Sequence, residues 1–472
     1  MSFILDEIFK KNKNKIAIIS AENTISYSQL HEETILWSAK LDRTIPNHSA
    51  VLVSLDNSAD FVILLLSLLY KRCKIYLYDN KAPLDDIYHI ANHYDIHFTV
   101  THHTTPNTLS LKDDIAISTL DNNTCLQDCG ISFFTSGTTN MPKAFFFNEN
   151  KLFHTLKYWA EYANMNESDI IFCPLSITHS HGIMLLLPAL INGATCIIQH
   201  FPYVDIERYL EIISKYKVTL FSAVPYVYAK MLQNDIEYVH NIFSLRLCIS
   251  GSAPLSKYIE ERFFDKFKTP ISQGYGLSEI GPISFNKFAN ERKGIFSVGK
   301  ILPQITYKII DKDGNNVSLG SEGELIVQSK WMATAYEKDD IATKEMYKKG
   351  WLHTQDIVKE DEEGFIYIIG RKSQFINISG HKVHPNEVES VLMSIDGILE
   401  AWVFPSFDEN KGQRICAKII TKNPTSAIKI REQCTYKLPN YKIPSEIHIV
   451  DEIKHNTINK KIEKYADFSK NK

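Results

Sequence analysis

The chain has 472 residues, of which 44% are hydrophobic and 23% are charged. At roughly 150 residues per domain this length predicts about three globular units. The composition excludes a wholly disordered, collagen-like or coiled-coil protein. The 52 basic and 55 acidic residues leave a net charge of −3, which favours neither a nucleic acid nor an anionic membrane as partner.

No segment of the sequence is typical of a secreted or membrane-spanning protein. The opening, MSFILDEIFKKNKNK, places acidic residues before its lysines and has no long apolar stretch. The most apolar run, 61–70, is about half of the roughly 20 residues that cross a bilayer. The run 183–198 is interrupted by Pro188, Asn192 and Gly193. We therefore expect a soluble, cytoplasmic protein.

The eight cysteines include no CxxC pair, and the two closest in sequence are Cys125 and Cys129. This spacing predicts reduced thiols rather than a disulfide framework or a zinc site.

In chain order, the first 120 residues alternate β-branched runs with helical patterns. Strands are predicted at 16–20, 50–55, 74–78 and 97–102, and helices at 27–41 and from about residue 60. The middle of the chain continues with strand-like runs at 194–199, 217–225 and 245–251. This alternation predicts βαβ units and a largely parallel sheet.

After about residue 300 the pattern changes, and short alternating strands at 306–311 and 323–329 predict a compact β element. From Arg371 to the end, 17 Lys and Arg stand against 12 Asp and Glu, whereas the preceding 370 residues are net acidic. A small basic domain is therefore expected after a large acidic one. A solvated surface explains this charge as readily as a polyanionic ligand does.

The segment 133–143 combines an apolar strand with a turn rich in hydroxyls and glycine, followed by proline and Lys143. Small residues let backbone N–H groups approach an anion, hydroxyls add donors, and the lysine supplies a positive charge for a phosphate. The segment is not the Walker pattern, which the chain lacks. Taken alone, it is equally typical of a polar surface turn.

This segment resembles the phosphate-binding loop of the adenylate-forming superfamily, which includes acyl- and aryl-CoA synthetases, peptide-synthetase adenylation domains and luciferases. The family loop is roughly [ST]SG[ST]TGxPK, and only Asn140 departs from it. Further motifs follow in the family's order, and the resemblance covers residues from about 15 to 464. They are PLSITHSHG (174–182), GSAPL (251–255), GYGLSE (274–279), GWLHTQD (350–356), GR (370–371) and SGHKV to Glu389 (379–389).

The resemblance implies roles for residues at the matching positions. The residues at the positions that bind the β- and γ-phosphates of ATP are Thr135, Ser136, Gly137, Thr138, Thr139 and Lys143. Those at the positions that contact the adenine are Gly251, Ser252 and Ala253. Tyr275 and Gly276 lie at the purine, where Tyr275 offers a face for stacking, although a buried core tyrosine is the plainer interpretation of such a residue.

Four further residues are assigned in the same way. Glu279 is a hard oxygen ligand suited to Mg²⁺, with Ser278 beside it for the metal and phosphates. Asp356 can accept both ribose hydroxyls, and Arg371 can reach ribose and phosphate oxygens. A carboxylate at a helix start and an aspartate in a turn are the structural alternatives for Glu279 and Asp356.

His179 corresponds to the family position beside the carboxylate pocket. His179 and His181 without acidic partners are poor candidates for a metal site. On the thiol side, Ser379, Gly380 and His381 match the segment that faces CoA.

Several positions depart from the family pattern. Gln355 replaces the glycine that usually precedes the ribose aspartate, and Ser373 stands at the expected hinge. The tail 454–464 resembles PxTxxGKIxR but lacks its proline and glycine. Counting from Thr457 places the catalytic lysine at Lys461, which matches more residues, and counting from Asp451 places it at Lys460. A solvated basic tail is the competing interpretation.

The expected fold is an α/β, multi-sheet N-terminal domain (1–370) with a β subdomain, followed by a small, mobile α+β cap (371–472) that rotates about Ser373. The expected reaction joins a carboxylic acid to AMP with release of pyrophosphate and then transfers the acyl group to a thiol. ATP, Mg²⁺ and CoA are the implied cofactors. No nucleic acid or membrane is expected as a partner.

The acid and the acceptor are less defined. PLSITHSHG carries no acidic residue that could hold a substrate ammonium, so a plain carboxylic acid is expected. Gly276 replaces the tryptophan of acetate-using relatives, which predicts open volume for a medium- or long-chain acyl or aryl acid. CoA is preferred as acceptor, and a separate acyl carrier protein stays open. The departures at Asn140 and Gln355 also fit a module that binds ATP or acyl-AMP without turnover.

Overall fold

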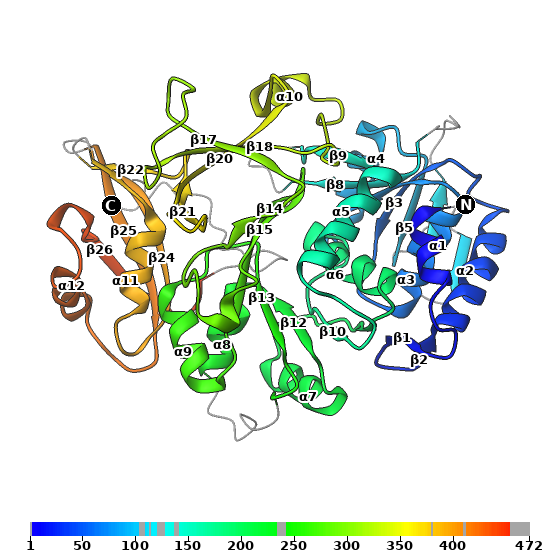
Figure 1. Cartoon of the computed structure of the whole chain (residues 1–472), viewed down its shortest axis with the longest axis horizontal. Helices are drawn as coiled ribbons and strands as arrows, with labels where there is room; N and C mark the ends of the chain where they lie inside the picture. The colour runs from blue at the N-terminus through cyan, green and yellow to red at the C-terminus, as the bar shows by residue number, and fades with distance from the viewer. Residues whose placement is uncertain are drawn as a thin grey trace.

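The computed structural model describes residues 2–102, 109–112, 115–119, 128–135, 141–233, 242–378, 381–408 and 412–453. In these ranges the chain forms two large sheets, a smaller antiparallel sheet and a C-terminal α+β unit, which follow one another across the molecule in Figure 1. The expected α/β, multi-sheet architecture is therefore confirmed. The division into domains at residue 370 stays a prediction.

The first large sheet has the strand order β6-β7-β5-β3-β4-β8-β9. Its strands are β3 (Ala50–Ser54), β4 (Lys74–Leu77), β5 (Phe98–Thr101), β6 (Leu109–Lys112), β7 (Ile115–Thr119), β8 (Gly130–Phe134) and β9 (Ala144–Asn148). The central strands β5, β3, β4 and β8 pair in parallel, and β7 and β9 pair antiparallel to them. Every residue of β3 is buried, as expected for a parallel strand covered on both faces.

The helices around this sheet are α1 (Phe3–Phe9), α2 (Tyr27–Leu41), α3 (Ala59–Tyr70), α4 (Leu84–His93) and α5 (Glu149–Tyr162). The apolar run 61–70 is helix α3, which begins at the capping side chain of Ser58 and is buried on all its faces. Of the described helices, none has the length and apolar character needed to cross a membrane.

The second large sheet has the order β16-β15-β14-β13-β12-β10-β11-β1-β2. Its strands are β1 (Ile16–Ile19), β2 (Thr24–Ser26), β10 (Ile170–Phe172), β11 (Thr195–Ile197), β12 (Leu220–Ala223), β13 (Leu247–Ser250), β14 (Ile271–Leu277), β15 (Gly281–Phe285) and β16 (Lys300–Ile301). Strands β1 and β10 to β14 pair in parallel, whereas the end of β14 turns back into antiparallel β15.

Helices α6 (Ser180–Ile191), α7 (Ile206–Tyr216), α8 (Pro225–Gln233) and α9 (Lys257–Phe267) accompany this sheet. The apolar run 183–198 proves to be two elements. Helix α6 ends at Ile191 with Asn192 as its C-cap, the chain turns at Gly193 with a φ of +78°, and β11 follows. The polar and glycine residues that interrupt the run are therefore the turn between a helix and a strand.

The compact β element after residue 300 is confirmed as an antiparallel sheet beside helix α10 (Asp340–Met346). It comprises β17 (Thr306–Ile310), β18 (Gly323–Gln328), β19 (Tyr347–Lys348), β20 (Trp351–Glu360) and β21 (Ile366–Arg371). The C-terminal unit follows with β22 (Ile376–Ile378), β23 (His381–Val383), α11 (Pro385–Met393), β24 (Ile398–Asp408), β25 (Gly412–Thr421), α12 (Ala427–Thr435) and β26 (Glu446–Ile449).

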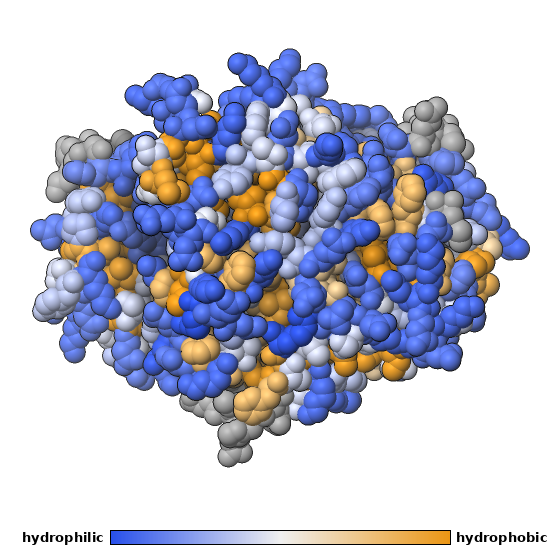
Figure 2. All heavy atoms as spheres, viewed as in Figure 1, coloured by the Kyte–Doolittle hydropathy of each residue, from blue (hydrophilic) through white to orange (hydrophobic). Residues whose placement is uncertain are grey.

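The described cysteines are all free, and Cys125 lies outside the described residues. The described part of the chain contains no cluster of His, Cys, Asp or Glu able to hold a metal by itself. On the face shown in Figure 2, hydrophilic residues predominate and the hydrophobic ones form several separate groups.

Candidate active site

Three residues that are far apart in the sequence meet at Asp356. Asp356 lies in β20, directly opposite Arg371 in the adjacent β21, and Tyr275 reaches it from β14 of the second sheet. The Tyr275 hydroxyl donates to Oδ2 of Asp356 at 2.6 Å, and Nε of Arg371 donates to Oδ1 at 3.1 Å. Asp356 is only 5% exposed. The structure thus joins the residues assigned to the purine and the ribose.

Burial and the Asp356 carboxylate both raise the pKa of Tyr275 well above its usual value, so its hydroxyl is a proton donor at neutral pH. Burial lowers the pKa of Arg371, but the nearby Asp356, Tyr275 and Glu279 raise it by a larger amount. The pKa of Arg371 is therefore above its usual value. Arg371 therefore lies in the field of both carboxylates of the site. Its side chain is still 45% exposed and remains accessible to a ligand.

Gln355 occupies a left-handed conformation with a φ of +62°. A non-glycine residue there costs about 1–2 kcal/mol, which explains why glycine is usual at this position. The side chain offsets part of this cost, since its Nε2 donates to Oε1 of Glu324 at 3.2 Å. Lys372 and His353 also contact Glu324, at 3.2 and 3.3 Å. The left-handed backbone conformation before Asp356, which a glycine usually provides, is therefore kept by Gln355.

Glu279 and Ser278 lie in the turn between β14 and β15. Glu279 is 6% exposed, its Oε1 accepts the hydroxyl of Tyr336, and its carbonyl oxygen accepts the N–H of Ala333 at 2.9 Å. Burial and the adjacent Glu279 raise the pKa of Tyr336 above its usual range. The Ser278 hydroxyl lies 3.1 Å from that of Ser180, at the start of α6.

The predicted phosphate loop leaves β8 and returns at β9. The N–H of Thr135 donates to the carbonyl of Lys143 at 2.9 Å, which closes the base of the loop. Nζ of Lys143 lies 5.6 Å from the ring centroid of Tyr336 and 3.9 Å from Oδ2 of Asp339. Residues 136–140, which include Ser136, Gly137, Thr138 and Thr139, lie outside the described residues. Tyr336 therefore links the base of this loop to Glu279.

The loop after β13 carries the residues assigned to adenine and packs on His181. Nδ1 of His181 lies 2.8 Å from the Ser252 hydroxyl and Nε2 lies 2.9 Å from that of Ser222. A Cβ atom at Gly251 would come within 3.1 Å of the imidazole. Ala253, the third residue of this group, follows Ser252 in the loop and is half-buried.

Sequence reasoning assigned the functional role to His179 and did not foresee this place for His181. The N–H of His179 donates to the carbonyl of Ser176 at 3.2 Å, where α6 begins, and its role at the carboxylate pocket stays a prediction. No spacing signal favoured His181, because its partners lie 41 and 71 residues away.

The prediction that Gly276 leaves an open volume is wrong. A Cβ atom there would lie 2.4 Å from the carbonyl oxygen of Gly281 and 3.0 Å from Cα of Pro282. The pairing of β14 with β15 shifts register between Tyr275 and Gly276, which brings the two backbones together. Glycine is required at this position by close approach, so it carries no information about the size of the acid.

The residues assigned to the hinge and the thiol side lie after β21. Ser373 is exposed in the turn, and His381 of β23 stacks on Tyr441 with 4.5 Å between ring centroids. His384 packs against Gly370, where a Cβ atom would lie 2.2 Å from its Nδ1. Ser379, Gly380, Lys460 and Lys461 lie outside the described residues.

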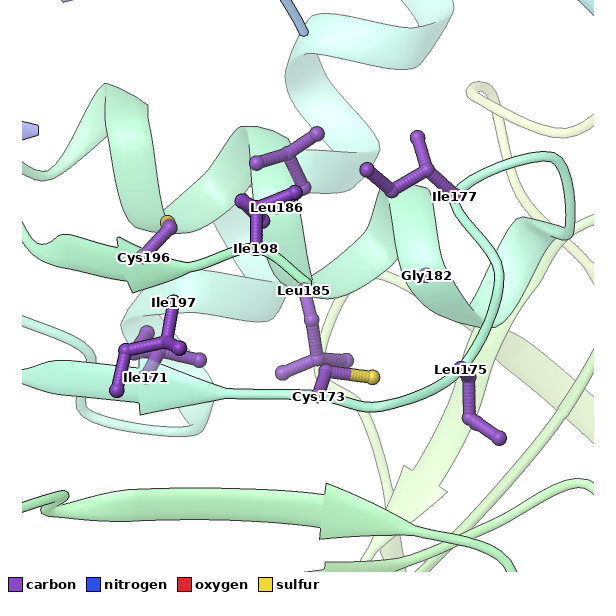
Figure 3. Close-up of a pocket in the computed structure, with 10 residues that line it drawn as sticks. All are labelled: Ile171, Cys173, Leu175, Ile177, Gly182, Leu185, Leu186, Cys196, Ile197 and Ile198. Carbon is purple, nitrogen blue, oxygen red and sulfur yellow. The ribbon is translucent and has the colours of Figure 1, made fainter. Parts of the chain in front are cut away.

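Figure 3 shows a small cavity between α6 and strands β10 and β11, lined by aliphatic side chains with Cys173 and Cys196. Its volume is about 20 Å³, whereas ligand pockets occupy about 300–1,000 Å³. An apolar cavity of this size is a packing void and does not serve as an acyl pocket.

A second, polar cavity of about 80 Å³ is lined by Asn57, Asn80, Lys81, Ser176 and His200, together with aromatic residues. These five residues follow β3, β4, β10 and β11, so the cavity lies beyond the carboxyl ends of parallel strands from both large sheets. Ligands of open α/β sheets bind at this end of the strands.

Comparison with known proteins identifies the family. The sequence model of the AMP-binding enzyme family matches residues 5–337, and that of the AMP-binding enzyme C-terminal domain matches residues 387–461. The chain is 29% identical over 354 residues to a 2-succinylbenzoate–CoA ligase of Oceanobacillus iheyensis, covering 74% of this chain and 72% of that protein. It is 30% identical over 303 residues to 4-coumarate–CoA ligase 2 of Solanum tuberosum, covering 61% of this chain and 55% of that protein.

Solved structures show the same fold. The anthranilate CoA ligase AuaEII in complex with anthranoyl-AMP superposes with a TM-score of 0.86 at 22% identity, covering 97% of this chain and 94% of that one. The o-succinylbenzoate CoA synthetase of Bacillus subtilis has a TM-score of 0.82 at 24% identity, with coverages of 98% and 97%. The chain therefore belongs to the AMP-binding enzyme family, as its resemblance to the adenylate-forming superfamily implies.

Proposed function

We propose that this protein activates a carboxylic acid with ATP and then transfers the acyl group to the thiol of CoA. The observation that carries the proposal is the convergence of Tyr275, Asp356, Arg371 and Glu279 in one site, with Lys143 held beside it by Tyr336. Relatives named as CoA ligases support the same chemistry.

In the first step, a carboxylate oxygen of the substrate forms a bond to the α-phosphorus of ATP while the bond to the bridging oxygen breaks, so pyrophosphate leaves with its electron pair. Asp356 accepts the ribose hydroxyls, and Gly251, Ser252 and Ala253 border the adenine. The loop from Thr135 to Lys143 binds the β- and γ-phosphates. Catalysis here consists of positioning and charge neutralisation.

The residues around Glu279 fit a magnesium ion. Glu279 is a buried carboxylate with one oxygen occupied by Tyr336, and Mg²⁺ is commonly bound by one or two carboxylates plus substrate phosphates. Bound there, the ion would neutralise charge on the phosphates. Glu279 and the neighbouring Ser278 would hold it against the nucleotide.

In the second step, the thiol sulfur forms a bond to the acyl carbon and AMP leaves with the electrons of the acyl–oxygen bond. Ser379, Gly380 and His381 are proposed to face the thiol after the 371–472 unit turns about Ser373. Lys461 is proposed to stabilise the charge that develops in the first step, with Lys460 as the alternative register.

The acid is proposed to be an aryl or a medium- or long-chain acyl acid. The segment 174–182 offers no carboxylate to a substrate ammonium, which favours a plain acid. Three of the similar proteins are named for 2-succinylbenzoate, 4-coumarate and anthranilate, all aromatic acids. Gly276 gives no information about the size of the acid.

The polar side chains around the second cavity, rather than its volume of about 80 Å³, support CoA over a carrier protein as acceptor. CoA carries three phosphate groups, whereas a carrier arm carries one. Lys81 is an exposed cation at the carboxyl ends of the parallel strands and can meet an anion, whereas His200 pairs with Asp56 at 3.2 Å. Lys81→Ala is therefore expected to raise KM for CoA several-fold and to leave acid-dependent ATP–pyrophosphate exchange unchanged. Lys40→Ala, on α2, is the control and should change neither quantity.

The proposal is tested by incubating the protein with ATP, Mg²⁺, a panel of acids from acetate to aromatic acids, and either CoA or a phosphopantetheinylated carrier. Mass spectrometry then identifies thioesters. The expected product is a CoA thioester of an acid larger than acetate. A preference for acetate would contradict the proposed acid class, and loading of the carrier alone would contradict CoA as acceptor. Absence of AMP and thioester with every acid would contradict the function.

A module that binds nucleotide without turnover is less well supported than the sequence alone implied. Gln355 replaces the usual glycine, yet the backbone there keeps the left-handed conformation and Asp356 keeps its contacts with Tyr275 and Arg371.

A further inference from the structure

Glu279 has one carboxylate oxygen engaged within the protein. Oε1 accepts the Tyr336 hydroxyl in a buried setting, where Tyr336 and Glu279 are each 6% exposed. A buried hydrogen bond to a charged group is among the stronger ones in proteins. The rotation of the Glu279 carboxylate is therefore set by where Tyr336 places its hydroxyl.

Tyr336 is itself held firmly, by groups outside the Glu279 turn. Tyr336 pairs with Phe145 of β9 in an isolated bridge, and its N–H donates to the Thr343 hydroxyl at 2.9 Å. The next residue, Glu337, donates its N–H to the Ala144 carbonyl at 2.7 Å. The tyrosine backbone is thus fastened to the first sheet, whereas Glu279 follows β14 of the second.

The side chain of Glu337 reinforces this attachment. Its Oε2 accepts Nζ of Lys74 at 2.6 Å and the Tyr76 hydroxyl at 2.8 Å, and its Oε1 accepts the Ser132 hydroxyl at 2.8 Å. Lys74 and Tyr76 belong to β4, and Ser132 belongs to the adjacent β8, the strand from which the phosphate loop leaves. Consecutive residues 336 and 337 therefore join the sheet below that loop to the candidate metal ligand.

We propose that Tyr336 is a positioning residue that leaves Glu279 a single carboxylate oxygen not engaged by the described residues and thereby sets the metal preference of the site. This inference rests on the proposed function, in which Glu279 meets the ion. Mg²⁺ requires near-ideal octahedral geometry and suits a one-oxygen carboxylate, whereas the larger Ca²⁺ accepts a bidentate one. Without the bond to Tyr336, the Glu279 carboxylate would bind Mg²⁺ more weakly but would keep its affinity for Ca²⁺.

Tyr347 provides a matched control. Its hydroxyl is buried in the same neighbourhood, with 6.1 Å between its ring centroid and that of Tyr336, and it makes no hydrogen bond to any described residue. Tyr336→Phe and Tyr347→Phe each remove one buried hydroxyl and keep the ring. Only the first removes a donor from Glu279.

The experiment measures equilibrium ATP binding by calorimetry while Mg²⁺ or Ca²⁺ is titrated, together with metal-free AMP binding and thermal unfolding. For Tyr336→Phe, we expect the half-saturating Mg²⁺ concentration to rise about tenfold, with little change for Ca²⁺ and for AMP. Tyr347→Phe should match the wild type in all three.

Unchanged Mg²⁺ dependence in folded Tyr336→Phe would overturn the inference. Equal weakening of Mg²⁺, Ca²⁺ and AMP binding, or the same shift in Tyr347→Phe, would also overturn it, because general packing explains such a result. ATP binding by the wild type that does not depend on the metal concentration would overturn the inference as well. The proposed function is judged separately, by acid-dependent ATP–pyrophosphate exchange in the wild type.

Discussion

At the residue scale, Gln355 shows how a departure from a family pattern can be absorbed. The position requires a left-handed backbone, and glutamine supplies a bond to Glu324 that glycine cannot. Gln355→Ala should keep the strain and lose the bond, so we expect it to lower the free energy of unfolding by about 1 kcal/mol. Gln355→Gly should relieve the strain and stay near the wild type. Urea denaturation tests this, and an alanine variant as stable as the glycine variant would contradict it.

The lysine prediction also belongs to single residues. Lys461→Ala should reduce acid-dependent adenylation by about 10²–10³, because an ammonium no longer meets the charge that develops at the α-phosphate. Thioester formation from supplied acyl-AMP should stay near normal. Lys460→Ala should do much less, because the motif register that places the catalytic lysine at Lys461 leaves Lys460 outside that role. The reverse order of effects would show that the register counted from Asp451 is correct.

At the scale of elements, a buried acid joins α9 to β14. Glu260 is 3% exposed on the inner face of α9, and Nε2 of Gln273, two residues before Tyr275, donates to it at 3.0 Å. Burial raises the pKa of Glu260 to about 7. The folded protein therefore binds this proton more tightly than the unfolded chain does.

Because the folded-state pKa is the higher one, the stabilisation is complete below the unfolded pKa near 4.5 and is lost as the pH rises through about 7. A shift of this size corresponds to about 3 kcal/mol. Glu260→Gln, which cannot ionise, should stabilise the protein more at pH 8 than at pH 5. Thermal unfolding at both pH values measures this, and an equal effect at the two would contradict it.

The elements also show what the sequence could predict. Apolar and β-branched runs located β1, β3, β4, β5, β8, β11, β12 and β13, whereas the remaining strands of the two large sheets were not predicted. The motif order singled out Asp356, Arg371 and Glu279. Two features depend on contacts across long sequence separations and left no local signal. These are the two hydroxyl partners of His181 and the Tyr336 bond to Glu279, whose members lie 57 residues apart. The approach of Gly276 to Gly281 is local, but it depends on a register shift between β14 and β15 that no sequence pattern indicated.

At the scale of the whole molecule, the proposed two-step reaction predicts that the 371–472 unit turns about Ser373 between the steps. Ser373 lies exposed in the turn after β21, where Lys372 and Gln374 donate their N–H groups to Gln355 and Arg371 at 2.8 and 3.0 Å. Ser373→Pro should fix φ at this turn and impair thioester formation more than adenylation. Ser373→Ala serves as control and should behave as the wild type. Equal loss of both steps in a folded proline variant would argue against a hinge here.

The central claim is that this chain activates a carboxylic acid through an adenylate. Acid-dependent ATP–pyrophosphate exchange tests it most directly, because it reports the first step and needs no knowledge of the thiol acceptor. We expect exchange that requires both Mg²⁺ and an acid larger than acetate, and that falls when Asp356 is replaced by asparagine. Binding of ATP and AMP without exchange across a broad acid panel would contradict it.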